Sequence, residues 1–434
     1  MSVLMEAESA TAERVATGLH FPTSLAFDDD GRAYVAESGL PFGGALAGGR
    51  VLRLRDDGGA DLIAEGLRAP VNGLVWHDGG FYVSEGGFPG RISRLTVDGA
   101  RTTVIDGLPG RGNYHTNTVA VGPDGMLYWG QGAMTNLGIV GLDAYDLAWL
   151  KQLPHPHDVP GLDVVLTGVN VETADPLEGP DARAVTGAFA PFGTTREAGQ
   201  RVAAGLPCTA AVLRCRPDGS GMERVAWGIR NAFGLGFLPD GRLIATDQGS
   251  DDRGSRPIAG VAELVFEVKP GAWYGWPDFI GGVPVTDPRF VPRRGPHPTF
   301  LLANHAELPP PERPLMELPV NSSACKFDVL PADGPWPGHL LMALFGDEVP
   351  MTAPTGPRSG RTVVRIDTDA WTAHLVDGLP PLHRPIDVRL HPVTGEAWVL
   401  DFGAFELQPG GGMQARAGSG TVWRLPLDAA NAGV

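Results

Sequence analysis

The sequence is poor in lysine and in long apolar runs, and each shortage excludes a class of protein. Only Lys151, Lys269 and Lys326 occur among 434 residues, and acidic side chains outnumber basic ones by 50 to 34, for a formal net charge of −16. Such a surface repels nucleic acid and anionic lipid, so neither is expected as a partner. No run of 18 apolar residues occurs, so no segment is expected to span a membrane. An anionic ligand would have to be held mainly by arginine.

Cysteine is also scarce, and the N-terminus carries no obvious leader. Cys208, Cys215 and Cys325 have no CxxC spacing and leave an odd thiol in any pairing. This favours buried free thiols over a disulfide or metal framework. The start, MSVLMEAESATAERVATG, lacks the basic region, apolar core and small-residue cleavage site of a secretory signal. The protein is therefore expected to be cytoplasmic unless a signal has been removed.

One hairpin pattern recurs six times and predicts the fold. Each copy has two short apolar-rich strands around a tight turn, as in LGFLPDGRLIAT at 235–246. The other copies lie at 25–36, 74–84, 119–130, 327–344 and 388–400. A third strand follows each hairpin, as in RVLRL at 50–54, and most copies add a fourth strand that ends in a Gly-Leu-type turn. Four antiparallel strands repeated six times predict an all-β fold, a six-bladed β-propeller.

The ends of the chain and two long loops complete this prediction. The strand pattern ERVATGL at 13–19 precedes any hairpin, whereas the sixth copy ends with its third strand at 421–425. The N-terminal strand is therefore expected to complete the last blade, which leaves no exposed sheet edge. We expect residues 1–434 to form a single propeller domain. It would carry a long insertion over 133–208 within blade three and an irregular segment over 271–320 after blade four.

Polar residues are expected to gather at one end of the channel. The first strand of each blade lines a propeller channel, so the residues that flank these hairpins converge there. They include His115, Arg230, Asn231, Gln248 and Arg384. An imidazole has an unperturbed pKa of about 6.5, which suits a general base at neutral pH. The two arginines suit a carboxylate or quinone oxygen. Any channel mouth is polar, but this combination favours a small-molecule site.

The turn DQGSDDRG after the second strand of blade four offers oxygen atoms to a cation. The backbone carbonyls of Gly249 and Ser250, with carboxylates nearby, could coordinate Ca²⁺, although the pattern is not that of an EF-hand. A solvated acidic turn explains the same residues equally well.

Four stretches resemble the soluble quinoprotein glucose and sorbosone dehydrogenases, which are six-bladed propellers that carry pyrroloquinoline quinone (PQQ) and Ca²⁺. They are YHTNTVAVGPDGMLY at 114–128, GIRNAFGLGFLPDGRL with DQG within 228–249, WYGWPDF at 273–279 and RPIDV at 384–388. The resemblance implies a dehydrogenase that oxidises a sugar or a related alcohol and passes electrons to an unidentified acceptor. It also implies a periplasmic or extracellular location if a signal has been removed.

The same resemblance implies roles for the residues at the channel mouth. His115 would take the hydroxyl proton of the sugar as hydride passes to the quinone, and Arg230 would polarise the quinone. Asn231, Gln248 and Arg384 would hold PQQ. The carbonyls of Gly249 and Ser250 would meet the calcium ion.

Three positions depart from the family pattern. Ala133 stands where a carboxylate usually orients the histidine, Gly346 lies where a lysine is expected, and Ile386 replaces a second cofactor arginine. PQQ carries three carboxylates, and burying them without paired cations is costly. Lys326 or Arg361 could supply the missing charge.

Two other functions therefore remain open. One is a calcium-dependent lactonase or hydrolase on the same scaffold. It is favoured by a set of carboxylates at the hairpin edges: Glu37, Glu85, Asp247, Asp347 and Asp401. The other is a non-catalytic binding propeller.

Overall fold

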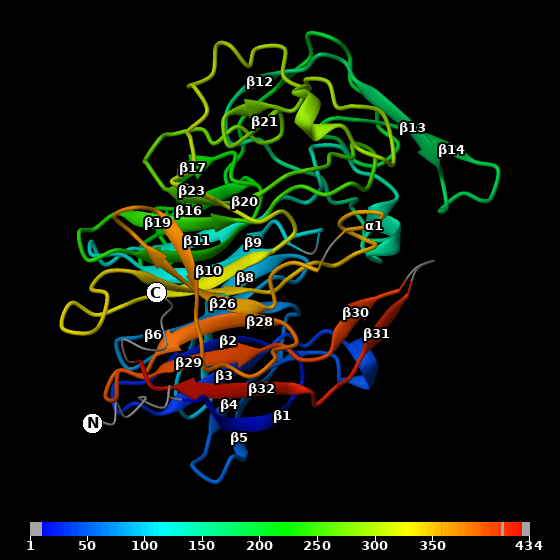
Figure 1. Cartoon of the computed structure of the whole chain (residues 1–434). Helices are drawn as coiled ribbons and strands as arrows, with labels where there is room; N and C mark the ends of the chain where they lie inside the picture. The colour runs from blue at the N-terminus through cyan, green and yellow to red at the C-terminus, as the bar shows by residue number, and fades with distance from the viewer. Residues whose placement is uncertain (1–10, 111, 357, 409–411, 428–434) are drawn as a thin grey trace, which may run out of the picture.

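The computed structural model describes residues 11–110, 112–356, 358–408 and 412–427. Within them six four-stranded antiparallel sheets form the blades of a propeller, which confirms the predicted all-β class (Figure 1). The innermost strands are β2 (Pro22–Phe27), β6 (Val71–His77), β10 (Thr116–Val121), β18 (Ala232–Phe237), β24 (Ala324–Val329) and β28 (Pro385–Leu390). Each contacts the next, and β28 contacts β2, which closes the ring around a central channel.

The other strands complete each blade outward from the channel. The second strands are β3 (Ala33–Glu37), β7 (Gly80–Glu85), β11 (Leu127–Gln131), β19 (Leu243–Asp247), β25 (Leu340–Leu344) and β29 (Ala397–Asp401). The third strands are β4 (Gly49–Leu54), β8 (Gly90–Leu95), β16 (Ala211–Cys215), β20 (Glu263–Glu267), β26 (Thr362–Asp367) and β32 (Gly420–Leu425). The outer strands are β5 (Ala60–Leu67), β9 (Arg101–Leu108), β17 (Glu223–Trp227), β23 (Met316–Leu318), β27 (Thr372–Leu375) and β1 (Glu13–Leu19).

The ring is closed by the N-terminal strand, as the sequence predicted. β1 pairs antiparallel with β32, with Glu13 opposite Arg424, and their side chains form an ion pair at 2.6 Å. The first ten residues, which include most of the stretch examined for a leader, lie outside the described residues. No helix among the described residues is long and apolar enough to cross a membrane.

The hairpin turns form because their residues favour them. Asp28, Asp124 and Asp240 each accept a hydrogen bond from the backbone N–H two residues later, which closes an Asx turn. The glycine of the turn then takes a positive φ, 74° at Gly125 and 89° at Gly241, which other residues adopt only with strain. This local chemistry favours the register of the first two strands in blades one, three and four.

Two long segments leave the blades. Between β11 and β16 the chain forms α1 (Asp143–Asp146) and two two-stranded sheets. One is the hairpin of β13 (Asn170–Ala174) and β14 (Arg183–Gly187), and the other pairs the strands before and after it, β12 (Val164–Val165) and β15 (Arg201–Val202). The β13–β14 hairpin projects from the body of the molecule (Figure 1).

The irregular segment 271–320 lies within blade four and includes the outer strand β23 near its end, so it does not follow that blade as the sequence suggested. It contains β21 (Phe279–Ile280), β22 (Val283–Pro284) and the 3₁₀ turn η2 (Pro288–Phe290). The outer strand β23 has only three residues and no Gly-Leu turn, so the repeat pattern did not reveal it.

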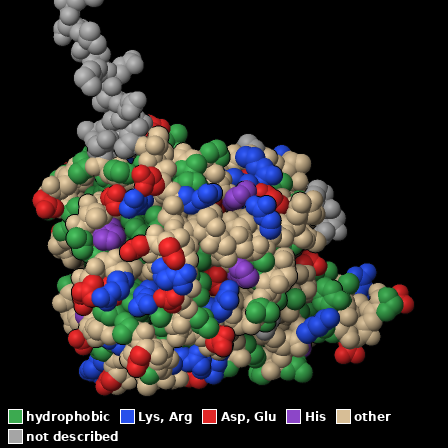
Figure 2. Space-filling model, turned by 90° about the horizontal axis from the view of Figure 1, so that it is seen from below, with side chains coloured by type: hydrophobic (Ala, Val, Ile, Leu, Met, Phe, Trp, Pro, Cys, Tyr) green, Lys and Arg blue, Asp and Glu red, His purple; other side chains and the backbone are tan. Residues whose placement is uncertain are grey.

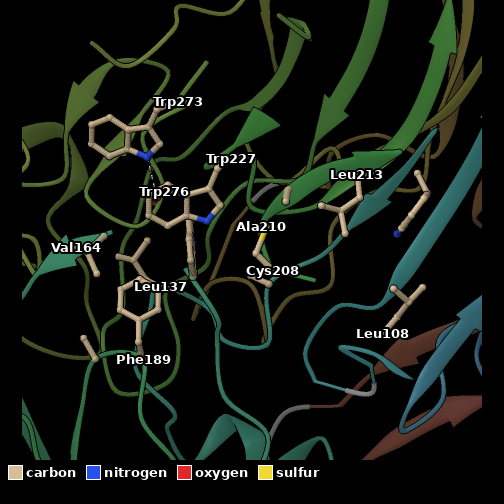
Figure 3. Packing of buried hydrophobic residues seen from close by; sticks show 14 of the residues in the cluster. Leu108, Leu137, Val164, Phe189, Cys208, Ala210, Leu213, Trp227, Trp273 and Trp276 are labelled. Atoms are coloured by element: carbon tan, nitrogen blue, oxygen red, sulfur yellow. Dashed lines mark hydrogen bonds between the residues drawn. The ribbon is translucent and has the colours of Figure 1, made fainter. Parts of the chain in front are cut away.

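The long segments pack onto blades three and four through a shared apolar core. Trp227 of β17 stacks with Trp273 at a ring-centroid distance of 6.2 Å, and Phe189 meets Trp276 edge to face at 6.2 Å. Figure 3 shows these side chains beside Leu137 and Val164 of the first segment. The core therefore holds both segments against blades three and four.

One face of the molecule carries mixed charge. On the face shown in Figure 2, lysine and arginine side chains lie interspersed with aspartate and glutamate. Elsewhere on the surface, Arg53 of β4 and Arg55, which follows β4, pair with Asp61 of β5 at 2.7 and 2.8 Å. Exposed pairs of this kind contribute only about 0–1 kcal/mol each, so stability comes mainly from the apolar contacts within and between blades.

Candidate functional site

The innermost strands are tied to one another by polar side chains around the channel axis. Asn117 of β10 donates a hydrogen bond to Asn231 Oδ1 of blade four at 2.7 Å. Thr246 of β19 donates to the backbone carbonyl of Cys325 of β24 at 3.0 Å. Ser24 of β2 accepts from the Leu74 N–H of β6 at 3.0 Å. Many polar residues near the axis are thus committed to holding the blades together.

Lys326 crosses the channel. Its fully buried Nζ donates to the backbone carbonyls of Thr23 at 2.6 Å and Asn72 at 2.5 Å, which belong to blades one and two, and lies 3.9 Å from the Asp387 carboxylate of blade six. Burial lowers the pKa of Lys326 to about 8, and the Asp387 charge opposes this shift. Lys326 therefore joins four blades, and it is already engaged by protein atoms.

The carboxylates at the ends of the second strands brace their own blades. Glu85 of β7 accepts a hydrogen bond from the Arg68 N–H at 2.6 Å, two from the Arg91 guanidinium at 2.7 Å each and one from Ser93 at 2.6 Å. Glu37, Asp247 and Asp401 likewise accept backbone N–H groups that precede the first strand of the blade. Four of the five carboxylates that favoured a calcium-dependent hydrolase thus have a structural explanation.

The predicted site residues lie at one end of the channel, which we call the mouth. His115, Arg230 and Arg384 directly precede or flank the start of the innermost strands of blades three, four and six. Gly132, which follows β11, donates its N–H to the His115 carbonyl at 2.9 Å, and Ala133 donates to the Arg230 carbonyl at 2.8 Å. The backbone after β11 therefore bonds to both His115 of blade three and Arg230 of blade four, and it fixes these two residues on adjacent blades.

Arg230 is held by protein atoms at every N–H group. Nε and Nη2 donate to the backbone and side-chain oxygens of Asn136 at 3.1 and 2.8 Å, and Nη2 also donates to Asp251 at 3.1 Å. Nη1 donates to the carbonyls of Gln248, at 3.0 Å, and Gly249. The ring of Tyr114 covers the guanidinium at 4.3 Å. Arg230 thus has no N–H left for a quinone oxygen in this structure.

Arg384 joins two loops. Its Nε donates to the carbonyl of Phe405, at the start of the β30 (Phe405–Leu407) and β31 (Met413–Ala415) hairpin, at 3.0 Å. Nη1 donates to the carbonyls of Gly346, at 3.1 Å, and Asp347, and Nη2 to Glu406 at 3.1 Å. Arg384 therefore fixes the loop after β25, where the sequence lacked the expected lysine.

The two carboxamides continue the same network. Asn231 donates to the Gln248 side-chain oxygen at 2.7 Å, and Gln248 donates to the Ser323 hydroxyl at 2.9 Å. Burial raises the pKa of the neighbouring Asp247 to about 6 and that of Glu263 to about 8. Asn231 and Gln248 therefore serve first to connect blades three, four and five.

Sequence reasoning missed the residues that organise this mouth. Asn136 donates to the carbonyls of Asp251, at 2.7 Å, and Arg253, at 3.1 Å, besides holding Arg230. Arg253 pairs with Asp143 of α1 at 2.6 Å and donates to the Tyr114 hydroxyl at 3.2 Å. An asparagine within the apolar stretch AMTNLGIV was the available signal, because a polar residue there needs buried partners.

Two arginines beside Arg384 keep N–H groups that no described residue accepts. Arg358 pairs with Glu406 at 3.1 Å and Asp347 at 3.5 Å and is 65% exposed, and Arg361 pairs with Glu406 at 2.6 Å while its Nε has no hydrogen-bond partner. Guanidinium groups bind carboxylates well, so a polycarboxylate such as PQQ fits these arginines better than it fits Arg230. The Glu348 carboxylate lies among the same charges, and burial raises its pKa while Arg384 opposes the shift.

Calcium fits this donor set poorly. Gly249 offers its carbonyl to Arg230, and the Ser250 hydroxyl donates to the Asn136 carbonyl at 3.4 Å. Within the described ranges, no three His, Cys, Asp or Glu side chains are grouped so that they could hold a metal.

Comparison with solved structures supports the fold. A Thermus thermophilus protein described as a putative oxidoreductase (glucose dehydrogenase) is 19% identical, with 96% of this chain and 100% of that chain covered and a TM-score of 0.55. The PQQ-bound aldose sugar dehydrogenase of Streptomyces coelicolor is 17% identical, with 96% of each chain covered and a TM-score of 0.55. The soluble aldose sugar dehydrogenase of Escherichia coli in its apo form is 12% identical, with coverages of 96% and 99% and a TM-score of 0.56.

The fold is that of the soluble sugar dehydrogenases. No family model and no curated protein matches the sequence. At these identities the sugar dehydrogenase fold is shared, whereas the activity has to be argued from the mouth itself.

Proposed function

We propose that this chain is a dehydrogenase that oxidises an aldose or a related alcohol at the mouth, with PQQ as the hydride acceptor. The observation that carries the proposal is the position of His115 at the start of β10, next to Tyr114, whose ring covers Arg230 and whose hydroxyl accepts from Arg253, in a fold shared with sugar dehydrogenases. One solved structure of this fold contains PQQ. An acidic protein of net charge −16 that gathers arginines at one end of its channel is equipped for a small anionic ligand.

Different residues of the mouth would bind the cofactor and remove the proton. Arg358 and Arg361 would hold carboxylates of PQQ through their remaining N–H groups. When bound, PQQ would supply the acceptor for the hydride that leaves the substrate carbon. His115 would accept the hydroxyl proton in the same step, so the alcohol loses one hydride and one proton. The Tyr114 ring, which lies over Arg230, shields that charge from water at the floor of the mouth.

The backbone and a neighbouring glycine position His115. The residue is half-buried, and its carbonyl accepts the Gly132 N–H. A Cβ on Gly86 would lie 2.6 Å from the Cβ of His115, so the absence of a side chain at Gly86 makes room for the histidine. Removal of a general base typically lowers the rate by about 10²- to 10⁴-fold.

Two measurements test the proposal. PQQ titrated into the purified protein should give a saturable change in the quinone absorbance, and the loaded protein should reduce an artificial electron acceptor with an aldose. His115→Ala should lower kcat about 100-fold or more and leave the PQQ titration nearly unchanged. His374→Ala on the outer strand β27 is the control and should keep full activity. Absence of PQQ binding, or of dye reduction across a broad sugar panel, would refute the proposal.

A further inference from the structure

The carbonyl oxygens at the turn after β19 already have a cationic partner. Arg230 Nη1 donates to the carbonyls of both Gln248 and Gly249. A calcium ion at the position that the family resemblance suggests would need the Gly249 oxygen. A guanidinium with its charge at that place competes directly with the ion for the same lone pairs.

The guanidinium is locked in position from every side. Its other three N–H groups donate to the two oxygens of Asn136 and to Asp251, and the side chain is only 3% exposed. Displacing it would leave five hydrogen bonds unmade and a buried charge unpaired. The arrangement is therefore a built feature of the mouth and not a loose contact.

The carboxylates of the same turn are also engaged elsewhere. Asp251 accepts from Arg230 and from Arg253, at 3.0 Å. Asp252 accepts the backbone N–H groups of Arg293 at 2.8 Å and Arg294 at 3.1 Å, on the segment before β23. Calcium binds six to eight oxygens and takes several from carboxylates, and these two carboxylates serve arginines and backbone amides instead.

We infer that Arg230 takes the place of a divalent cation, so that this mouth binds its organic cofactor without Ca²⁺. The positive charge that a metal ion would bring to the floor of the mouth is supplied by a side chain fixed by Asn136 and Asp251. The part of the inference that concerns an organic cofactor rests on the proposed function. The part that concerns calcium is independent of it.

Calcium alone tests the metal question. The protein is washed with EDTA, exchanged into metal-free buffer and titrated with CaCl₂ in a calorimeter, and its Tm is measured with 5 mM CaCl₂ and with EDTA. We expect no saturable heat and the same Tm in both buffers. A site with a dissociation constant of about 50 μM would raise the Tm of a chain of this length by about 3 °C. Saturable binding of one Ca²⁺ with such a rise would overturn the inference.

PQQ binding in the same two buffers tests the role of the charge. We expect equal dissociation constants with CaCl₂ and with EDTA; binding that needs calcium would overturn the inference. Arg230→Met should weaken PQQ binding at least 10-fold, and Arg230→Lys, which keeps the charge, should weaken it less. Arg242→Met, at an exposed turn, is the control. Equal binding by wild type and Arg230→Met would also overturn it. Absence of PQQ binding in both buffers would refute the proposed function, while the calcium calorimetry would still decide whether a metal site exists.

Discussion

Replacement of Lys326 by methionine should destabilise the protein in a way that depends on pH. The ammonium group donates to the Thr23 and Asn72 carbonyls and lies 3.9 Å from Asp387, within a fully buried part of the channel. Methionine has a similar length and no charge, so Lys326→Met removes the links to blades one and two without creating a large cavity. The buried carbonyls lose their donor, and Asp387 loses part of its compensation.

The sign of the pH dependence follows from the lowered pKa. Lys326 titrates at about 8 in the folded protein, because of burial, against 10.5 when exposed. Between these values the unfolded chain binds more protons than the folded one, so the free energy of unfolding increases as the pH rises. Below pH 8 the cost of burying the protonated Lys326 is fully present. The gain between pH 7 and pH 10 is about 2–3 kcal/mol. Lys326→Met lacks this gain. The difference in free energy of unfolding between wild type and Lys326→Met should therefore widen by about 2–3 kcal/mol from pH 7 to pH 10.

Urea unfolding of both proteins at pH 7, 8, 9 and 10 measures this difference. Lys269→Met is the matched control, since Lys269 is half-exposed and, among the described residues, its ammonium group pairs with Glu312 alone, at 2.8 Å. That control should shift stability by no more than about 0.5 kcal/mol at each pH. A Lys326→Met difference that stays constant or narrows between pH 7 and pH 10 would refute the assignment of a buried lysine with a lowered pKa in the channel.

Two further substitutions separate structural from functional residues near the mouth. Glu85→Ala leaves Arg91 without its buried partner, which costs about 3–5 kcal/mol and lowers the Tm by about 3–5 °C in a chain of this length. Activity per folded molecule at 25 °C should stay within about twofold, and a loss of activity at unchanged Tm would contradict the bracing role. Gly86→Ala should displace His115 and lower kcat about 100-fold with little change in Tm. Gly356→Ala, at an open exposed position, is the control, and an active Gly86→Ala enzyme would argue against His115 as the base.

The propeller could be predicted because each blade is encoded locally. The turn aspartates and glycines, such as Asp240 and Gly241, act within a few residues of themselves, and the strands beside them need only a repeated apolar pattern. β23 escaped detection for the same reason. Its three residues follow about 50 residues of irregular chain and are defined by pairing with β20, which a local pattern does not contain.

The location of the mouth was also predictable, but the tasks of its residues were not. Chain topology alone brings His115, Arg230 and Arg384 to one end of the channel. Whether an arginine is free to bind a ligand depends on its partners, and those of Arg230 include Asn136, 94 residues away in a segment that sequence reasoning treated as a long loop. The residue type gives the number of hydrogen-bond donors on a side chain, whereas its partners depend on the tertiary structure.

At the mouth, positive charge is held in place by a network of arginine, aspartate and asparagine side chains. A metal ion brings two positive charges that leave with the ion, whereas Arg230 and its neighbours form a fixed network in which Asp251 is shared with Arg253 and Asn136 orients both. Such a network is preorganised, so little reorientation is needed when an anionic ligand arrives. The N–H groups that remain without an acceptor lie on Arg358 and Arg361, not on Arg230 and Arg253. Under the proposed function, ligand recognition and charge compensation would therefore fall to different arginines, so a protein with only three lysines and an engaged Arg230 would still have cationic donors for a polyanion.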